Sequence, residues 1–333
     1  MHVDETLIRS VVEQVLTRLG GNGNGAAIGG GYQGRFGLFT DVGQAVAAAR
    51  EAFERLSRRT LEDRKRIVSH IRRISTEQRV ELGTMEMEET KIGRLPHKIE
   101  KLIGAASVPG VEFLRSEVFS GDHGLSVIEH APFGVICAIT PVTHSLPTIA
   151  CNAISMISAG NTVVVNPHPS GRRVAAEGVR RFNEAIYRDL GIDNLLCLIT
   201  EPTIETADAL FKHRDINLIA VTGGQAVARA AMQQPKRAIV AGPGNPPVVV
   251  DETADLDRAA RSIITGCAYD NNLLCIAEKQ VFVVDEVFDK MMAAMERAGA
   301  VRRTRAPGQH SARGHHGRLP AMPPRMSRAP FSG

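Results

Sequence analysis

The stretch Gly134-Val-Ile-Cys-Ala-Ile-Thr140 is an unbroken apolar run of strand length, typical of a strand that is buried on both faces of a sheet. The residues after it repeat this pattern, with apolar runs and amphipathic segments in alternation. We predict strands at 134–140, 162–165, 195–199, 218–221 and 238–241, with helices at 147–158, 171–187, 204–213 and 225–232. This β-α alternation predicts an α/β fold with a parallel sheet, whose ligands bind where the strands end.

Flanking segments extend this core on both sides. Before it, helices are predicted from Asp41 to about Leu56 and from Thr60 to about Gly83, and the helical pattern continues through residue 115. Residues 118–129, broken by a glycine-rich turn at 121–124, predict a β-hairpin. After the core come a strand at 248–251, a helix at 255–266, a strand at 281–284 and a helix at 287–298. We therefore predict two domains, residues 36–241 and 242–300.

Composition and charge exclude several classes of protein. The chain of 333 residues has a net charge of +4, but residues 301–333 hold seven arginines and no acid, which leaves 33 basic and 36 acidic side chains, or −3, in residues 1–300. The acids interspersed among the basic residues of 60–83 argue against nucleic-acid binding by that stretch, and no apolar run reaches the roughly 18 residues of a membrane span. Five cysteines without a CxxC pair or metal-ligand spacing predict no metal site and a reducing, cytoplasmic setting.

One cysteine stands in a reactive setting, within the run Asp270-Asn-Asn-Leu-Leu-Cys-Ile-Ala-Glu-Lys279. The polar residues 270–272 favour an exposed turn, and Lys279 supplies nearby positive charge, which favours the thiolate. We therefore predict that Cys275 is a nucleophile, although a lone cysteine is more often a small buried apolar residue. The other cysteines are assigned to packing: Cys137, Cys151, Cys197 and Cys267.

The same run resembles the nucleophile loop of CoA-acylating aldehyde dehydrogenases, especially the propionaldehyde and acetaldehyde enzymes of bacterial microcompartments. The resemblance extends over about residues 36–297, with several motifs in the family's order. It implies an aldehyde dehydrogenase-like fold, with a Rossmann-type NAD-binding domain over residues 36–241 and an incomplete α/β catalytic domain over 242–300. It also implies NAD as cofactor, CoA and a short aliphatic aldehyde as substrates, and full-length relatives that are homo-oligomers.

The predicted cofactor site lies where the strands of the sheet end. The GxGxxG fingerprint is absent, but Asn166-Pro-His-Pro-Ser-Gly171 and Thr222-Gly-Gly224 each close a predicted strand and open a helix, and helix N-termini favour phosphate. Either motif alone could be an ordinary tight turn; both at one sheet edge predict a dinucleotide site. The resemblance assigns the adenosine side to Asn166–Ser170 and leaves NAD or NADP open, with NAD preferred. The predicted cofactor residues are Thr140, Pro141, Asn166, His168, Pro169, Thr222, Gly223, Gly224, Val227 and Gly242.

The loop Gly242-Pro-Gly-Asn-Pro246 bears on the reaction type. In hydrolytic aldehyde dehydrogenases the corresponding loop carries a glutamate that activates water, whereas here no acid lies between Val240 and Val250. A thioester that is passed to CoA needs no activated water, and a glutamate that activated water would cause hydrolysis of the thioester. The loop could also be a simple connector. The oxyanion of the first step needs donors; the N–H of Cys275 is one candidate, and the resemblance points to His144 as the other, where relatives often have asparagine.

Both ends of the chain stand apart from these domains. Residues 1–20 have the spacing of an amphipathic helix and residues 21–35 the composition of a flexible linker. The resemblance suggests a targeting helix that binds a microcompartment shell protein; a helix that folds back on its own protein is the alternative. Residues 301–333 are basic and aperiodic and resemble out-of-frame translation, so we expect a truncated or frame-shifted chain. Two rival functions remain open: a catalytically dead fragment that still binds shell protein, and an acyl-phosphate reductase on the same fold.

Overall fold

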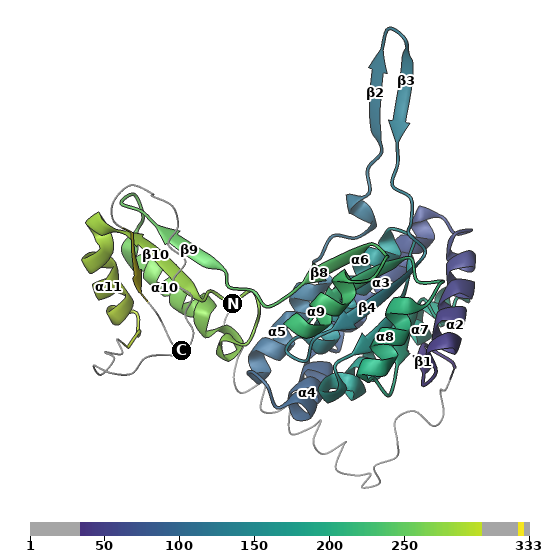
Figure 1. Cartoon of the computed structure of the whole chain (residues 1–333), viewed down its shortest axis with the longest axis horizontal. Helices are drawn as coiled ribbons and strands as arrows, with labels where there is room; N and C mark the ends of the chain where they lie inside the picture. The colour runs from purple at the N-terminus through teal and green to yellow at the C-terminus, as the bar shows by residue number, and fades with distance from the viewer. Residues whose placement is uncertain (1–33, 302–325, 330–333) are drawn as a thin grey trace. The chain divides into compact units, whose positions relative to one another are not determined.

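The computed structural model describes residues 34–301 and the backbone of residues 326–329 (Figure 1). The chain divides into two compact units, with unit 1 ending at Pro243 and unit 2 beginning at Gly244. The predicted helix over 1–20, nearly all of the predicted linker and most of the predicted tail lie outside the described residues. Within the described residues, no helix is both long and apolar enough to cross a membrane.

Unit 1 is built on a six-stranded sheet in which all neighbouring strands are parallel, in the order β1-β6-β5-β4-β7-β8. The strands are β1 (Leu38–Phe39), β4 (Val135–Thr140), β5 (Thr162–Pro167), β6 (Leu196–Ile199), β7 (Leu218–Thr222) and β8 (Ala238–Ala241). The predicted parallel sheet is confirmed. The edge strand β1 was not predicted, because two residues are too few to show a strand period.

Helices cover both faces of this sheet (Figure 1). They are α2 (Val42–Leu56), α3 (Leu61–Glu77), α4 (Arg79–Thr90), α5 (Leu95–Ala106), α6 (Ser145–Ser158), α7 (Arg172–Leu190), α8 (Ile204–Lys212) and α9 (Gln225–Met232), with short 3₁₀ turns at Val111–Phe113 and Pro169–Gly171. Alternate strand residues enter separate cores: Ala138 and Val163 pack with α3, α6 and α7, whereas Cys137 and Val164 pack mainly with α2 and α8. Burial on both faces explains why these strands are continuous apolar runs.

The helix predicted over 60–83 is in fact two helices. Gln78, with φ −100° and ψ 14°, leaves helical geometry between α3 and α4. The Gln78 N–H donates to the carbonyl of Ile74 in α3, and the Gln78 carbonyl accepts from the N–H of Leu82 in α4. A glutamine carries no helix-breaking signal, so the period of apolar residues runs across the break.

A hairpin follows these helices. Strand β2 (Glu117–Gly121) pairs antiparallel with β3 (Gly124–Ile128), as predicted, and all residues of both strands are exposed. Figure 1 shows the hairpin projecting from unit 1. It therefore adds no packing to the sheet that holds the predicted cofactor residues.

Unit 2 has a three-stranded sheet in the order β11-β10-β9. Strand β9 (Pro247–Val250) runs parallel to β10 (Gln280–Val284), and β11 (Met326–Ala329) runs antiparallel to β10. Its helices are α10 (Leu256–Ala268) and α11 (Phe288–Arg297), the latter preceded by a 3₁₀ turn at Asp285–Val287. The core contains Ile263, Val281 and Met291. The predicted strand-helix-strand-helix series is confirmed, and β11 is an unpredicted strand within the aperiodic tail.

Candidate active site

Cys275 lies on a loop that begins with three successive residues in the left-handed conformation. Asp270, Asn271 and Asn272 have φ values of 50°, 58° and 59° in the 3₁₀ segment that follows α10, Tyr269–Asn272 (η3). Aspartate and asparagine tolerate this conformation better than other residues with a side chain, which is why this run favours a turn. The predicted turn is confirmed. Its predicted exposure is wrong for Asp270, whose exposed fraction is 0%.

Lys279 and Asn272 hold this loop together. The Lys279 ammonium donates to the Asn272 carbonyl at 3.1 Å, to the Asn272 side-chain oxygen at 2.6 Å and to the Leu274 carbonyl at 2.9 Å. The Asn272 amide donates in turn to the carbonyls of Cys267 and Glu278, at 2.6 and 3.2 Å. Lys279 was expected to act as a charge near the thiol; the contacts show that its ammonium fixes the backbone on the amino side of Cys275.

The predicted nucleophile, Cys275, is accessible. Cys275 is exposed, and its N–H makes no hydrogen bond within the described residues, so this N–H can donate to a ligand. Gly244 lies directly against it, because a Cβ at Gly244 would be 2.1 Å from the Cys275 carbonyl oxygen. Only glycine fits this approach. The acid-free segment that begins unit 2 therefore abuts the nucleophile loop.

The other four cysteines have properties of packing residues. Cys137 and Cys197 are buried in strands; burial raises the pKa of Cys137 to about 12 and raises that of Cys197 well above its ordinary value. Cys151 is partly buried against the core, which raises the pKa of its thiol. Burial and the nearby Glu278 carboxylate raise the pKa of Cys267. These thiols stay protonated at neutral pH and are poor nucleophiles.

The predicted cofactor residues of unit 1 lie at one edge of its sheet. The register pairs Thr140 with Pro167 across β4 and β5, and Thr222 with Ala241 across β7 and β8, so these strands end together. The chain continues from β4 to β5 on one side and from β7 to β8 on the other, so the switch point at which such sheets bind ligands lies between β4 and β7. There Thr140 is 2% exposed, and its hydroxyl has no partner among the described residues. The remaining predicted residues at this edge are Pro141, Asn166, His168, Pro169, Gly223, Gly224 and Gly242, with Val227 in α9.

Two glutamates of α4 occupy helix N-termini at this edge. Glu86 accepts hydrogen bonds from the first two N–H groups of α6, at 3.3 Å each. Glu89 accepts from the N–H groups of Arg173 and Val174 in the first turn of α7, at 2.8 and 2.7 Å. The positive ends of these helices are thus already paired with carboxylates. Sequence reasoning missed both caps, because they join residues 59 or more positions apart.

The N-terminus of α9 differs. Helix α8 is capped by the side chains of Thr203 and Thr206, whereas α9, which follows Gly223 and Gly224, has no side-chain cap. A Cβ at Gly224 would meet nothing within 4 Å, and one at Gly223 would meet Val227 at 3.1 Å. The first N–H groups of α9 are therefore left for an anion such as a pyrophosphate. Together with the orphaned hydroxyl of Thr140, this N-terminus fits a dinucleotide.

The adenosine-side motif is only partly available to a ligand. Asn166 is buried, and its side-chain oxygen accepts from the Thr206 hydroxyl at 2.7 Å. Any contact of Asn166 with a cofactor would therefore use its backbone. His168 and Pro169 are exposed, and the His168 ring accepts from the Ser170 N–H at 3.1 Å. Their cofactor roles stay predictions.

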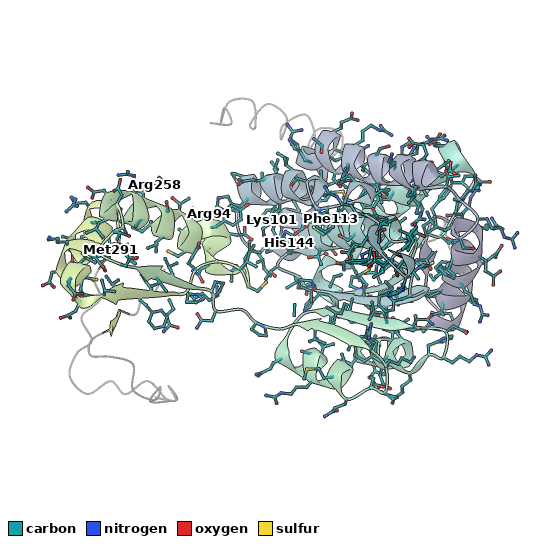
Figure 2. All side chains as sticks on the ribbon, turned by 90° about the horizontal axis from the view of Figure 1, so that it is seen from above. Arg94, Lys101, Phe113, His144, Arg258 and Met291 are labelled. Atoms are coloured by element: carbon teal, nitrogen blue, oxygen red, sulfur yellow. The ribbon has the colours of Figure 1, made fainter. Side chains whose placement is uncertain are left out.

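His144 stands in the turn between β4 and α6. The carbonyl of the preceding residue, Thr143, accepts from Lys101 at 3.0 Å and from Lys98 at 3.3 Å. Lys98 also pairs with Glu86 at 3.0 Å, and both of their side chains are at most 1% exposed. Figure 2 labels Lys101 and His144 in unit 1. Burial raises the pKa of Glu86, while the Lys98 ammonium and a backbone N–H oppose that rise.

One cavity in the described part of the chain lies away from the predicted cofactor residues. A cavity of about 260 Å³ lies at the opposite, amino edge of the sheet, where its lining includes Gly134, Asp215 and Asn217. No three His, Cys, Asp or Glu side chains gather in the described part of the chain in a way that could hold a metal. The carboxyl edge of the sheet and the Cys275 loop are therefore the candidate functional regions.

Comparison with known proteins adds a family. The aldehyde dehydrogenase family pattern matches residues 37–311, past residue 297, where the resemblance read from the sequence stops. The acetylating acetaldehyde dehydrogenase EutE of Salmonella typhimurium is 44% identical over 272 residues, 81% of this chain and 58% of that protein. The CoA-propanoylating propanal dehydrogenase of Citrobacter freundii is 37% identical over 299 residues, 90% of this chain and 63% of that protein.

A solved structure agrees with these sequence relatives. The propionaldehyde dehydrogenase of Rhodopseudomonas palustris, with bound CoA and an acylated cysteine, superposes with a TM-score of 0.76 and 40% identity, covering 80% of this chain and 61% of that one. The strand order of unit 1 defines a doubly wound α/β protein of the dinucleotide-binding type. The chain belongs to the aldehyde dehydrogenase family. It spans less than two thirds of the length of the relatives named here.

Proposed function

We propose that this protein is an NAD-dependent, CoA-acylating aldehyde dehydrogenase that acts on a short aliphatic aldehyde. The single observation that carries this proposal is the Cys275 loop, in which an exposed thiol sits on a fixed backbone beside a segment without acids. A water-activating carboxylate is missing from residues 241–249. This absence favours release of the acyl group to a thiol over release to water.

The reaction divides into two half-reactions at one sulfur. The Cys275 thiolate attacks the aldehyde carbon; a C–S bond forms and the carbonyl oxygen becomes an oxyanion, for which the Cys275 N–H and His144 are the proposed donors. The carbonyl would re-form as this carbon loses a hydride, for which NAD, when bound, would be the acceptor, and a thioester would remain on Cys275. The CoA thiolate then attacks the thioester carbon, the bond to Cys275 breaks, and acyl-CoA leaves with the cysteine restored as thiolate.

The residues of unit 1 would hold the cofactor. The N-terminus of α9, opened by Gly223 and Gly224, is the proposed pyrophosphate site, and the Thr140 hydroxyl offers a further polar contact at the switch point. NAD is proposed over NADP from the resemblance of the sequence to the family, whereas the structure of an engineered glycolyl-CoA reductase, 40% identical, contains NADP⁺. Binding of NADH and NADPH, followed by fluorescence, measures this preference directly.

Trapping the covalent intermediate tests the proposal. Incubation with propionaldehyde and NAD without CoA should leave a propionyl group on the Cys275 peptide, detected by mass spectrometry, and added CoA should remove it. Cys275→Ala should carry no adduct, whereas the matched variant Cys267→Ala should carry the wild-type amount. Release by phosphate but not by CoA would favour the acyl-phosphate reductase instead. An adduct on Cys267 would remove Cys275 as nucleophile.

We also propose a shell-protein partner for residues 1–20, which lie outside the described residues. Support comes from their amphipathic pattern and from a relative in solved structures, the propionaldehyde dehydrogenase of a fucose-utilisation bacterial microcompartment in Clostridium phytofermentans, which is 44% identical. Deletion of residues 1–20 should abolish co-purification with shells and leave solution activity unchanged. Shell capture of the deleted form would contradict this proposal, and loss of activity alone would point to a helix that folds back on the protein.

Self-association of this chain is a further part of the proposal. The β2–β3 hairpin exposes apolar side chains that a partner subunit would cover, among them Val118, Phe119 and Leu125, with exposed fractions of 59, 57 and 67%. Replacing Phe119 by aspartate should lower the mass measured by light scattering from that of an oligomer to that of a monomer. A monomeric wild-type chain would contradict it.

A further inference from the structure

The ring of His144 contacts a hydroxyl group of α6. Its Nδ1 lies 2.9 Å from the hydroxyl oxygen of Thr148, one turn further along α6. Thr148 is 7% exposed, and its hydroxyl makes no other hydrogen bond in the described part of the chain. If Nδ1 carried the proton, the buried hydroxyl hydrogen would have no acceptor. Satisfying both groups requires that the hydroxyl donates to Nδ1, which leaves the proton of a neutral ring on Nε2.

The backbone on both sides of His144 is fixed by charged side chains. On the amino side, Lys98 and Lys101 donate to the Thr143 carbonyl. On the carboxyl side, Glu86 accepts from the first two N–H groups of α6. Ring and backbone of His144 are thus held by separate contacts, one from α6 itself and the others from α4 and α5.

Core packing alone does not require the charged groups around His144, which are those of Glu86, Lys98 and Lys101. The desolvation of a buried ion pair costs free energy, and apolar side chains of similar volume often stabilise a protein as well or better. What charged groups add is one defined arrangement, because each must keep its partners. The Glu86–Lys98 pair is therefore better explained by a need to fix the geometry of the turn at His144 than by a gain in stability.

We propose that Thr148 is a positioning residue that holds His144 as the Nε2–H tautomer, so that the ring presents a hydrogen-bond donor in the turn after β4. This inference rests on the proposed function, in which His144 is a donor to the oxyanion. A ring with its proton on Nδ1 would present a lone pair to that oxyanion and repel it. Thr148 thereby determines whether the His144 ring can serve as that donor.

The tautomer can be measured without turnover. Histidine ring nitrogens, labelled with ¹⁵N and observed by NMR at about pH 9, where neutral rings dominate, give distinct signals for protonated and unprotonated nitrogen, and His144→Gln identifies the signals of this ring. Wild type and Thr148→Ser should show protonated Nε2 with a hydrogen-bonded Nδ1. Thr148→Val, which keeps the shape and removes the hydroxyl, should lose the signature of a hydrogen-bonded Nδ1. Protonated Nδ1 in wild type, or an unchanged spectrum in Thr148→Val, would overturn the proposal.

Kinetic measurements distinguish a positioning role of Thr148 from an effect on the stability of the protein. In an active enzyme, Thr148→Val should lower kcat about fivefold to tenfold, the effect of one lost hydrogen bond, with KM unchanged, and Thr148→Ser should restore it. Ile71→Val, a mild core change in α3, should lower the unfolding temperature without this change in kcat. If the chain shows no turnover with CoA or phosphate as acyl acceptor while the NMR result holds, the proposed function fails and the tautomer assignment stands. Equal kcat in Thr148→Val and wild type contradicts the positioning role of Thr148.

Discussion

Replacing Lys279 by methionine should loosen the loop that carries the nucleophile. The side chain keeps its length and apolar stem but loses the ammonium, and with it three hydrogen bonds to acceptors on Asn272 and Leu274. Each is worth about 1 kcal/mol net, so the change removes about 2–3 kcal/mol of support from this loop. The loop needs that support, because three successive left-handed residues cost up to about 1–2 kcal/mol each.

Hydrogen exchange and single-turnover kinetics measure the result. In Lys279→Met, the hydrogen-bonded amides of Leu273 and Ala277 should exchange about 30- to 160-fold faster, the equivalent of about 2–3 kcal/mol. Acylation of Cys275 should slow at least tenfold, because displacement of a nucleophile by about 1 Å is costly. Lys290→Met, in the exposed surface of α11, is the matched control and should leave both unchanged. Wild-type exchange and acylation in Lys279→Met would refute the role of these contacts.

Other variants test separate parts of the structure. Gly244→Ala should slow acylation strongly, because its Cβ would lie 2.1 Å from the carbonyl oxygen of the nucleophile; a wild-type acylation rate would contradict that close approach. Glu86→Gln should lower the free energy of unfolding by about 3–5 kcal/mol, because it leaves the buried Lys98 ammonium without its carboxylate. The double variant Glu86→Leu/Lys98→Met should recover part of this loss. Chemical denaturation measures both changes, and an unchanged free energy in Glu86→Gln would contradict the expectation. A hydrogen bond from Arg72 lowers the pKa of Glu112 from 4.5 to about 2, so this pair stabilises the fold above pH 4.5 and ceases to do so as pH falls towards 2. Glu112→Gln should therefore lower the unfolding temperature slightly at pH 7 and not at pH 2, and a pH-independent difference would contradict this.

The fold was largely predictable because its signal is local. Parallel strands that are buried on both faces are continuous apolar runs, and the helices between them keep their own period. What escaped prediction has no such signal. Strand β1 has two residues, Gln78 divides α3 from α4 without a breaker, and β11 pairs with β10 from an aperiodic stretch.

The contacts that support the candidate site residues could not be predicted from the sequence. Strand ends and the Cys275 run could be identified from sequence, because a parallel sheet gathers the carboxyl ends of its strands at one edge. The carboxylates that cap α6 and α7 come from α4, 59 or more residues away, and nothing in sequence spacing indicates them. The burial of Asp270 and the use of Asn166 by Thr206 likewise depend on tertiary contacts.

NADH formation by the 333-residue chain with propionaldehyde and NAD, with and without CoA, beside the same chain carrying Cys275→Ala, tests the proposed reaction most directly. We expect turnover that requires CoA and is lost in the variant. Turnover retained by Cys275→Ala, or equal turnover without CoA, would contradict it.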